Sequence, residues 1–138
     1  MHLDTPCIGI CSTVYGDSIC RGCKRYDHEI IDWNRYTSKE KGVIYQRLET
    51  QFSTIMSEYI EVADPAMLAA KVLHLQLRLR SGASVAEQAF HLLRLYAHKI
   101  QHIEKYGLMI KPAYRHLPLP ALLSEIDTQL FAHAHQQK

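Results

Sequence analysis

The sequence lacks a hydrophobic run long enough to cross a membrane, since a helical span needs about 20 consecutive apolar residues. Its first residues, Met-His-Leu-Asp-Thr-Pro, have neither the basic start nor the apolar centre of a signal peptide. A glycine-rich phosphate loop, a nucleophile elbow and paired catalytic carboxylates are also missing. These absences predict a cytoplasmic protein that has no membrane partner and is not an enzyme.

Cysteine is absent after residue 23, so all four cysteines lie close together near the N-terminus. They form two short pairs, Cys7-x3-Cys11 and Cys20-x2-Cys23, separated by eight residues. Because cytosolic thiols stay reduced, such a cluster is more typical of a metal site than of a disulfide framework. Each pair presents two sulfurs from one loop, so four sulfurs can surround one metal ion or one small iron–sulfur cluster. We therefore predict that Cys7, Cys11, Cys20 and Cys23 are the ligands.

The kind of inorganic centre stays open, because four sulfurs suit zinc and iron–sulfur clusters equally. Zinc ribbons usually separate their pairs by more than about ten residues, so the shorter spacing favours a cluster. The Arg-Gly inside the second pair instead favours a zinc knuckle. Arg21, Lys24 and Arg25 flank that pair and would favour thiolates, although ordinary surface cations are equally expected there. A redox-active dithiol at Cys20 and Cys23 is a remote third alternative.

The rest of the chain predicts helices. The composition, with 47% hydrophobic and 22% charged residues, is that of a globular protein, and the net charge of +2 is too small to indicate nucleic acid. Three sequences are typical of helix starts: Thr37-Ser-Lys-Glu40, Asp64-Pro65 and Ser84-Val-Ala-Glu87. The helices are expected over about 28–35 (capped by Asp27), 38–62, 65–81, 85–106 and 120–134, with an ordered loop over 108–120 and a frayed tail after residue 133.

These elements predict a mostly α protein: a small four-cysteine knuckle on a bundle of about four helices. The expected division is a metal-binding segment over 1–36 and a helical body over 37–138. Trp33, the only tryptophan, is expected to seat the first on the second. Within 65–81, Val72–Leu79 alternates as a strand would, but leucine content and Gly82 as a stop favour helix. That helix would carry two apolar stripes (Leu68, Val72, Leu75 and Leu79; Ala70, Leu73 and Leu77), which fits a homodimer interface.

Histidines offer a second candidate site. His91, His98 and His102 share one side of the predicted 85–106 helix with Glu87. His98 and His102, four residues apart, could together hold a metal. Arg94 and Lys105 lie on the same face, however, and cations repel a bound dication. A solvated polar face is therefore the preferred interpretation. Lys71, His74 and Arg78 could extend it into a basic patch, but with few aromatic residues among them nucleic acid is not favoured.

The cysteine segment resembles a known family. Thr5-Pro-Cys-Ile-Gly-Ile-Cys11, Ile19-Cys-Arg-Gly-Cys-Lys-Arg25, Glu29-Ile30 and Trp33 are similar to the YdhL-like family of small bacterial proteins, which have unknown function and are predicted to bind iron–sulfur clusters. The resemblance covers about residues 5–48 and implies that the four cysteines are cluster ligands. It implies nothing for the helical body.

The sequence therefore favours a non-enzymatic iron–sulfur protein. It would act in electron transfer, redox sensing or assembly, through another protein that docks on the helical body. The alternative is a structural zinc module in an adaptor or regulator that contacts nucleic acid.

Overall fold

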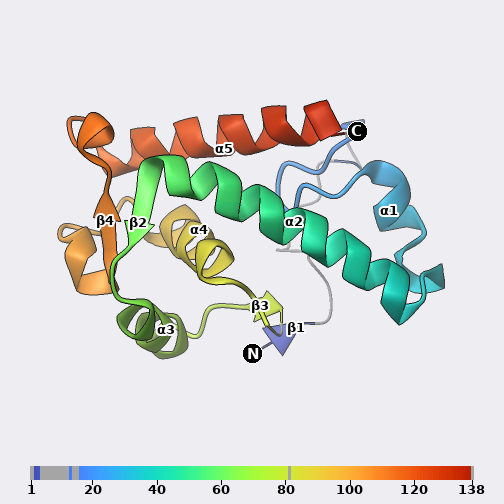
Figure 1. Ribbon diagram of the computed structural model, residues 1–138, viewed down its shortest axis with the longest axis horizontal. Coiled ribbons are helices and arrows are strands. Elements are labelled where there is room, and N and C mark those ends of the chain that lie inside the picture. The colour runs from blue at the N-terminus through green and yellow to red at the C-terminus, as the bar shows by residue number, and fades with distance from the viewer. Residues whose placement is uncertain (1, 4–12, 14–15, 81, 138) are drawn as a thin grey trace.

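The computed structural model describes residues 2–3, 13, 16–80 and 82–137. Its architecture is mostly helical, as predicted (Figure 1). Two long helices, α2 (Ser38–Tyr59) and α5 (Leu119–Gln137), run side by side in opposite directions, and α4 (Val85–Tyr96) packs against α2. The shorter α3 (Pro65–His74) packs on α4. No described helix has both the length and the apolar composition that a bilayer crossing requires.

The main core fills the space between α2, α4 and α5. Leu68, Leu92 and Leu93 have no exposed surface, and Phe52 and Phe90 place their rings 5.2 Å apart. The inward side of α5 carries Leu122, Ile126 and Leu130, which are all fully buried. The inward side of α2 carries a buried stripe of Ile44, Leu48, Phe52, Ile55 and Tyr59.

All three predicted helix starts in the body are confirmed. The Thr37 hydroxyl accepts a hydrogen bond from the Glu40 amide, and the Glu40 carboxylate accepts one from the Thr37 amide. Asp64 caps α3 through the Met67 amide, and Ser84 caps α4 through the Glu87 amide. At α1 (Asp27–Ile31) the prediction was off by one residue: Tyr26 is the N-cap residue, and its amide donates to Glu29. A separate 3-10 helix, η2 (Trp33–Arg35), follows α1.

The helix ends were predicted less well. Residues 60–62 do not continue α2 but form strand β2 (Ile60–Val62), which pairs antiparallel with β4 (Leu108–Ile110). Residues 97–106 do not continue α4: a turn follows Tyr96, then the 3-10 helix η3 (Ile103–Tyr106). The predicted 108–120 loop contains β4 and the 3-10 helix η4 (Pro112–Tyr114). The tail beyond residue 133 belongs to α5 as far as Gln137.

The 65–81 helix was also predicted too long, because α3 ends at His74. Gln76 adopts a left-handed conformation (φ +54°), its amide donates to the Leu73 carbonyl, and the Leu77 amide donates to the Val72 carbonyl. This bond pair is the Schellman motif that closes many helices. The alternating residues that follow lead into β3 (Leu79–Arg80), which pairs in parallel with β1 (His2–Leu3).

Candidate metal centre

Cys20 and Cys23 occupy one tight turn. An antiparallel bridge joins Ile19 to Tyr26, the Cys20 amide donates to the Arg25 carbonyl at 2.9 Å, and the Lys24 amide donates to the Cys20 carbonyl at 2.9 Å. Lys24 adopts a left-handed conformation (φ +67°), which is uncommon outside glycine and turns the chain back on itself. The turn thus holds both cysteines within one short loop, as each half of a four-sulfur site requires.

Both cysteines are buried, with 1% and 3% of Cys20 and Cys23 exposed. The Arg25 Nε donates to the Cys23 Sγ at 3.2 Å. Hydrogen bonding with Cys20 and burial raise the pKa of the Cys23 thiol above its ordinary value, whereas the nearby Arg25 charge lowers it. The two cysteines can therefore become thiolates only where positive charge compensates them, and a bound metal provides that charge directly.

The flanking cations are mostly not surface residues. Lys24 and Arg25 are buried, with 1% and 4% exposed. The Lys24 ammonium donates to Asp127 of α5 at 2.7 Å and to the Arg21 carbonyl. The Arg25 guanidinium lies 4.9 Å from the Trp33 ring centre. Arg21 is exposed, pairs with Asp17 and stacks on the ring of Phe131.

Two sets of contacts attach the turn to the helices. In the first, Trp33 is buried and packs with Ile44 and Leu48 of α2, as the sequence predicted for this residue. In the second, Ile19 and Tyr26 pack with Ala134 and Phe131 of α5. Figure 1 shows the turn and α1 beside the end of α5 and the first half of α2.

A buried ion pair reinforces the attachment to α2. Glu29, 4% exposed, accepts two hydrogen bonds from the Arg47 guanidinium, at 2.5 and 2.6 Å. The same guanidinium lies 4.3 Å from the centre of the Tyr26 ring. Such paired, stacked geometry is specific to arginine. In the sequence, Glu29 stands out only as part of a motif and Arg47 does not stand out at all, because helical spacing does not reveal a partner eighteen residues away.

The other half of the predicted ligand set, Cys7 and Cys11, lies outside the described residues. Within the described ranges, no group of three or more His, Cys, Asp or Glu side chains could hold a metal ion. The donor chemistry of Cys20 and Cys23 nevertheless fits a soft metal: two thiols on one turn, with an arginine N–H at one sulfur. These two residues can supply half of a tetrahedral site.

The histidines do not form the predicted polar face. His91 is only 7% exposed, next to Phe52 and Phe90, and burial together with the charges of Arg94 and Lys24 lowers its pKa to about 4. Glu87 is also buried, because α4 packs against both α2 and α3. His98 and His102 are exposed and lie beyond the end of α4, so their i, i+4 helical spacing is lost.

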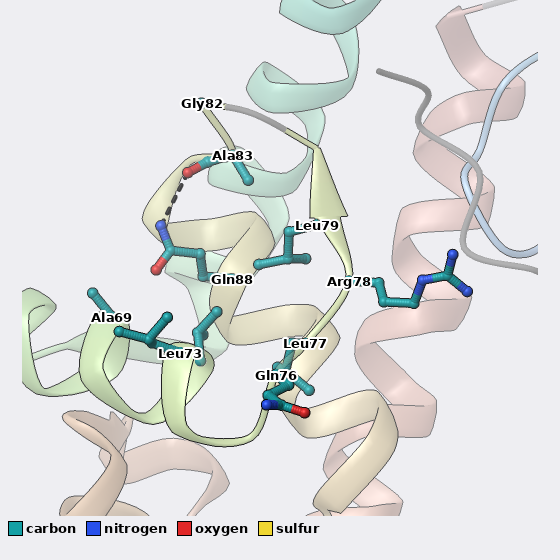
Figure 2. A pocket seen from close by; sticks show the side chains of 10 residues that line it. Ala69, Leu73, Gln76, Leu77, Arg78, Leu79, Gly82, Ala83 and Gln88 are labelled. Carbon is teal, nitrogen blue, oxygen red and sulfur yellow. Dashed lines mark hydrogen bonds between the residues drawn. The ribbon is translucent and has the colours of Figure 1, made fainter. Parts of the chain in front are cut away.

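A hollow lies elsewhere, between α3, β3 and the start of α4 (Figure 2). Its volume is about 780 Å³, and its walls are mainly apolar, with Leu73 79% exposed. Gln88 donates to the Ala83 carbonyl at one end, and the Arg78 side chain points away from the hollow. The described residues of its lining offer a surface for contact and include no acid, histidine or thiol for chemistry.

A family model described as "Protein of unknown function (DUF1289)" matches residues 5–51. The match covers all four cysteines, α1, η2 and the first part of α2, and it includes both partners of the Glu29–Arg47 pair. It is about a third of the chain, and the main core around α4 and α5 lies outside it. No curated protein and no solved structure matched the chain.

Proposed function

We propose that Cys7, Cys11, Cys20 and Cys23 bind one inorganic centre, with an iron–sulfur cluster preferred, and that the helices present this centre to another protein. The observation that carries the proposal is the turn at Cys20 and Cys23. It gathers two buried cysteines, supplies an N–H donor to one sulfur and is attached to two helices. A centre held this rigidly suits electron transfer, redox sensing or cluster assembly, and we infer no enzymatic reaction.

The cytoplasm is the compartment that suits this proposal, since its thiols remain reduced. The resemblance to the YdhL-like family supports the iron–sulfur preference. A structural zinc ion is the second candidate, because a tight turn with two buried cysteines serves equally well as half of a zinc site. As a zinc module the protein would act as an adaptor or regulator, and contact with nucleic acid would then belong to the proposal.

Anaerobic purification with metal and sulfide analysis tests the two candidates. A brown protein whose visible absorption bleaches with dithionite, and which contains iron and acid-labile sulfide, supports the cluster. A colourless protein with one zinc ion per chain supports the alternative. A metal-free protein that reversibly forms a Cys20–Cys23 disulfide would overturn both and favour a redox dithiol.

Variants connect the metal to the turn. Cys20→Ser and Cys23→Ser remove one sulfur each and are expected to abolish binding of the metal or cluster. Ser18→Ala is the matched control in the same turn: the Ser18 carbonyl accepts from the Asp27 amide, and the substitution leaves that backbone bond in place. If the cysteine variants keep their metal, the proposed ligand set is wrong.

For the partner, we propose that the apolar hollow beside α3 is part of the docking surface. The exposed Leu73 and the mainly apolar lining support this. A second copy of the chain is one occupant, and light scattering distinguishes it: Leu73→Asp converts a dimer to a monomer if copies meet there. A wild-type protein that is monomeric at high concentration removes the homodimer.

A further inference from the structure

A second, smaller pocket lies directly beside the cysteine turn. It is enclosed by the turn, the end of α4 and the first turns of α5, and its volume is about 330 Å³. This volume falls in the range of sites for small molecules. The lining consists of Arg21, Gly22, Phe90, Arg94, Pro120, Leu123, Ser124 and Asp127.

Among the described residues, Arg94 forms no ion pair within 4 Å, although the charge of Asp127 in the same pocket acts on it. The Arg94 Nε is buried and has no hydrogen-bond partner in the described part of the chain. A buried guanidinium N–H is costly unless an acceptor meets it. Its planar donors match the two oxygens of a carboxylate or the oxygens of a phosphate.

The neighbouring charges are already paired. The Asp127 carboxylate accepts from the buried Lys24 ammonium at 2.7 Å, so an anion in the pocket meets a neutralised pair rather than a free carboxylate. Arg21 has Asp17 at 3.3 Å and stacks 4.6 Å from the centre of the Phe131 ring. His91, close to both Arg94 and Lys24, stays neutral near pH 7 and adds no charge of either sign. The excess charge of the pocket is therefore the one carried by Arg94.

The remaining walls are apolar. Phe90, Pro120 and Leu123 line the pocket, and Ser124 adds one hydroxyl. A bare inorganic anion would leave these walls without a partner. A molecule with an apolar body and one carboxylate would use both the walls and the arginine.

We propose that this pocket binds a small organic carboxylate, whose oxygens pair with Arg94 and whose apolar body lies against Phe90, Pro120 and Leu123. Because Arg21 and Gly22 belong to the cysteine turn, such a ligand would touch the segment that carries Cys20 and Cys23. The proposal does not depend on which metal, if any, those cysteines hold.

Benzoate is a suitable probe, because it joins a carboxylate to an apolar ring, and benzamide is its neutral analogue of the same shape. NMR titration of the full-length protein should shift the signals of Leu123, Ser124 and the Phe90 ring on addition of benzoate. Benzamide should bind about tenfold more weakly or worse, since it lacks the charge that Arg94 recognises. Inorganic phosphate should also bind more weakly, because it makes no contact with the apolar walls.

Arg94→Gln should weaken benzoate binding by about tenfold or more, while Arg35→Gln, a matched change at an exposed arginine, should leave it within about twofold. Equal binding of benzoate and benzamide to the natural protein overturns the proposal, even if Arg94→Gln fails to fold. Benzoate shifts that map elsewhere, or phosphate binding as tight as benzoate binding, overturn it as well.

Discussion

The cysteine turn and the main core are held together in different ways. Around the turn, buried charges supplement two small apolar clusters: Lys24 pairs with Asp127, Glu29 pairs with Arg47, and Arg25 lies over Trp33. Between α2, α4 and α5 a large cluster of buried apolar side chains makes the main contacts, and the Gln51 amide adds a hydrogen bond to the Leu130 carbonyl. A segment of some twenty residues cannot bury enough apolar surface to fold alone, so ion pairs, stacking and, as we propose, a metal centre replace the missing core.

The largest expected effect lies in the apolar core. Ile126→Ala removes a fully buried side chain and should lower the free energy of unfolding by about 4 kcal/mol. Urea denaturation followed by circular dichroism measures this loss. Leu73→Ala, at a side chain that is 79% exposed, should change stability by less than about 0.5 kcal/mol. Equal losses for the two variants would contradict the assignment of the core.

His91 should make the core sensitive to acid. Its pKa is about 4 in the folded protein, against 6.5 for an unperturbed histidine, because burial and the charges of Arg94 and Lys24 disfavour the imidazolium. The unfolded chain therefore binds the proton first as the pH falls. The contribution of His91 to the free energy of unfolding is therefore fully present above pH 6.5. It falls by about 3 kcal/mol as the pH approaches 4.

The free energy of unfolding of His91→Gln and of the control His98→Gln, measured between neutral pH and about pH 4, tests whether His91 causes this loss of stability in acid. Other carboxylates titrate in the same range, so the difference from the natural protein is the informative quantity. The His91 variant should lose less stability on acidification than the natural protein. The His98 variant should lose as much as the natural protein. An unchanged acid response in His91→Gln would mean that His91 is not the group that titrates.

The Glu29–Arg47 pair should matter less than the core, but clearly more than a surface pair. Arg47→Met leaves the Glu29 carboxylate buried without its partner and should cost about 2 kcal/mol, a reduced value because a quarter of the arginine side chain is exposed. The double variant Glu29→Leu, Arg47→Met should recover much of that loss, since no unpaired charge remains. A double variant as unstable as the single one would indicate that stacking on Tyr26, rather than charge, carries the contact.

The smallest effect is expected at the exposed ion pair between Asp32 and Arg35, whose atoms are 3.7 Å apart. Arg35→Gln should change the free energy of unfolding by less than about 0.5 kcal/mol, because solvent screens this pair. Comparing the stability losses of Arg35→Gln and Arg47→Met shows how much more a buried ion pair contributes than an exposed one in the same part of the chain. A loss similar to that of Arg47→Met would remove this distinction.

Local rules predicted the helix starts well and the helix ends poorly. Thr37, Asp64 and Ser84 cap helices as their side chains suggest, because a cap is formed within four residues. Gln76, by contrast, ends α3 in a conformation that glycine usually takes. Strand β2 replaces the end of α2 because it pairs with β4, almost fifty residues later, and such a partner leaves no local signal.

Gly107 follows the 3-10 helix η3 and is needed there for its small size. It has φ +77°, and a Cβ there would collide with the Asp64 carbonyl oxygen. At the candidate site, the predicted packing of Trp33 on α2 is confirmed, and the four cysteine ligands stay a prediction. The sequence did not predict that Lys24 would be buried against Asp127, more than a hundred residues away, because that contact depends on how α5 packs. Long-range charge pairs of this kind become visible only in the folded chain.

X-ray absorption at the metal edge of the anaerobically purified protein identifies the atoms that bind the metal. We expect a first shell made only of sulfur, either the cysteine and sulfide sulfurs of an iron–sulfur cluster or four thiolates at about 2.3 Å from zinc. Cys20→Ser should disrupt that shell. A first shell of nitrogen or oxygen, or an unchanged sulfur shell in Cys20→Ser, would contradict a centre built on these four cysteines.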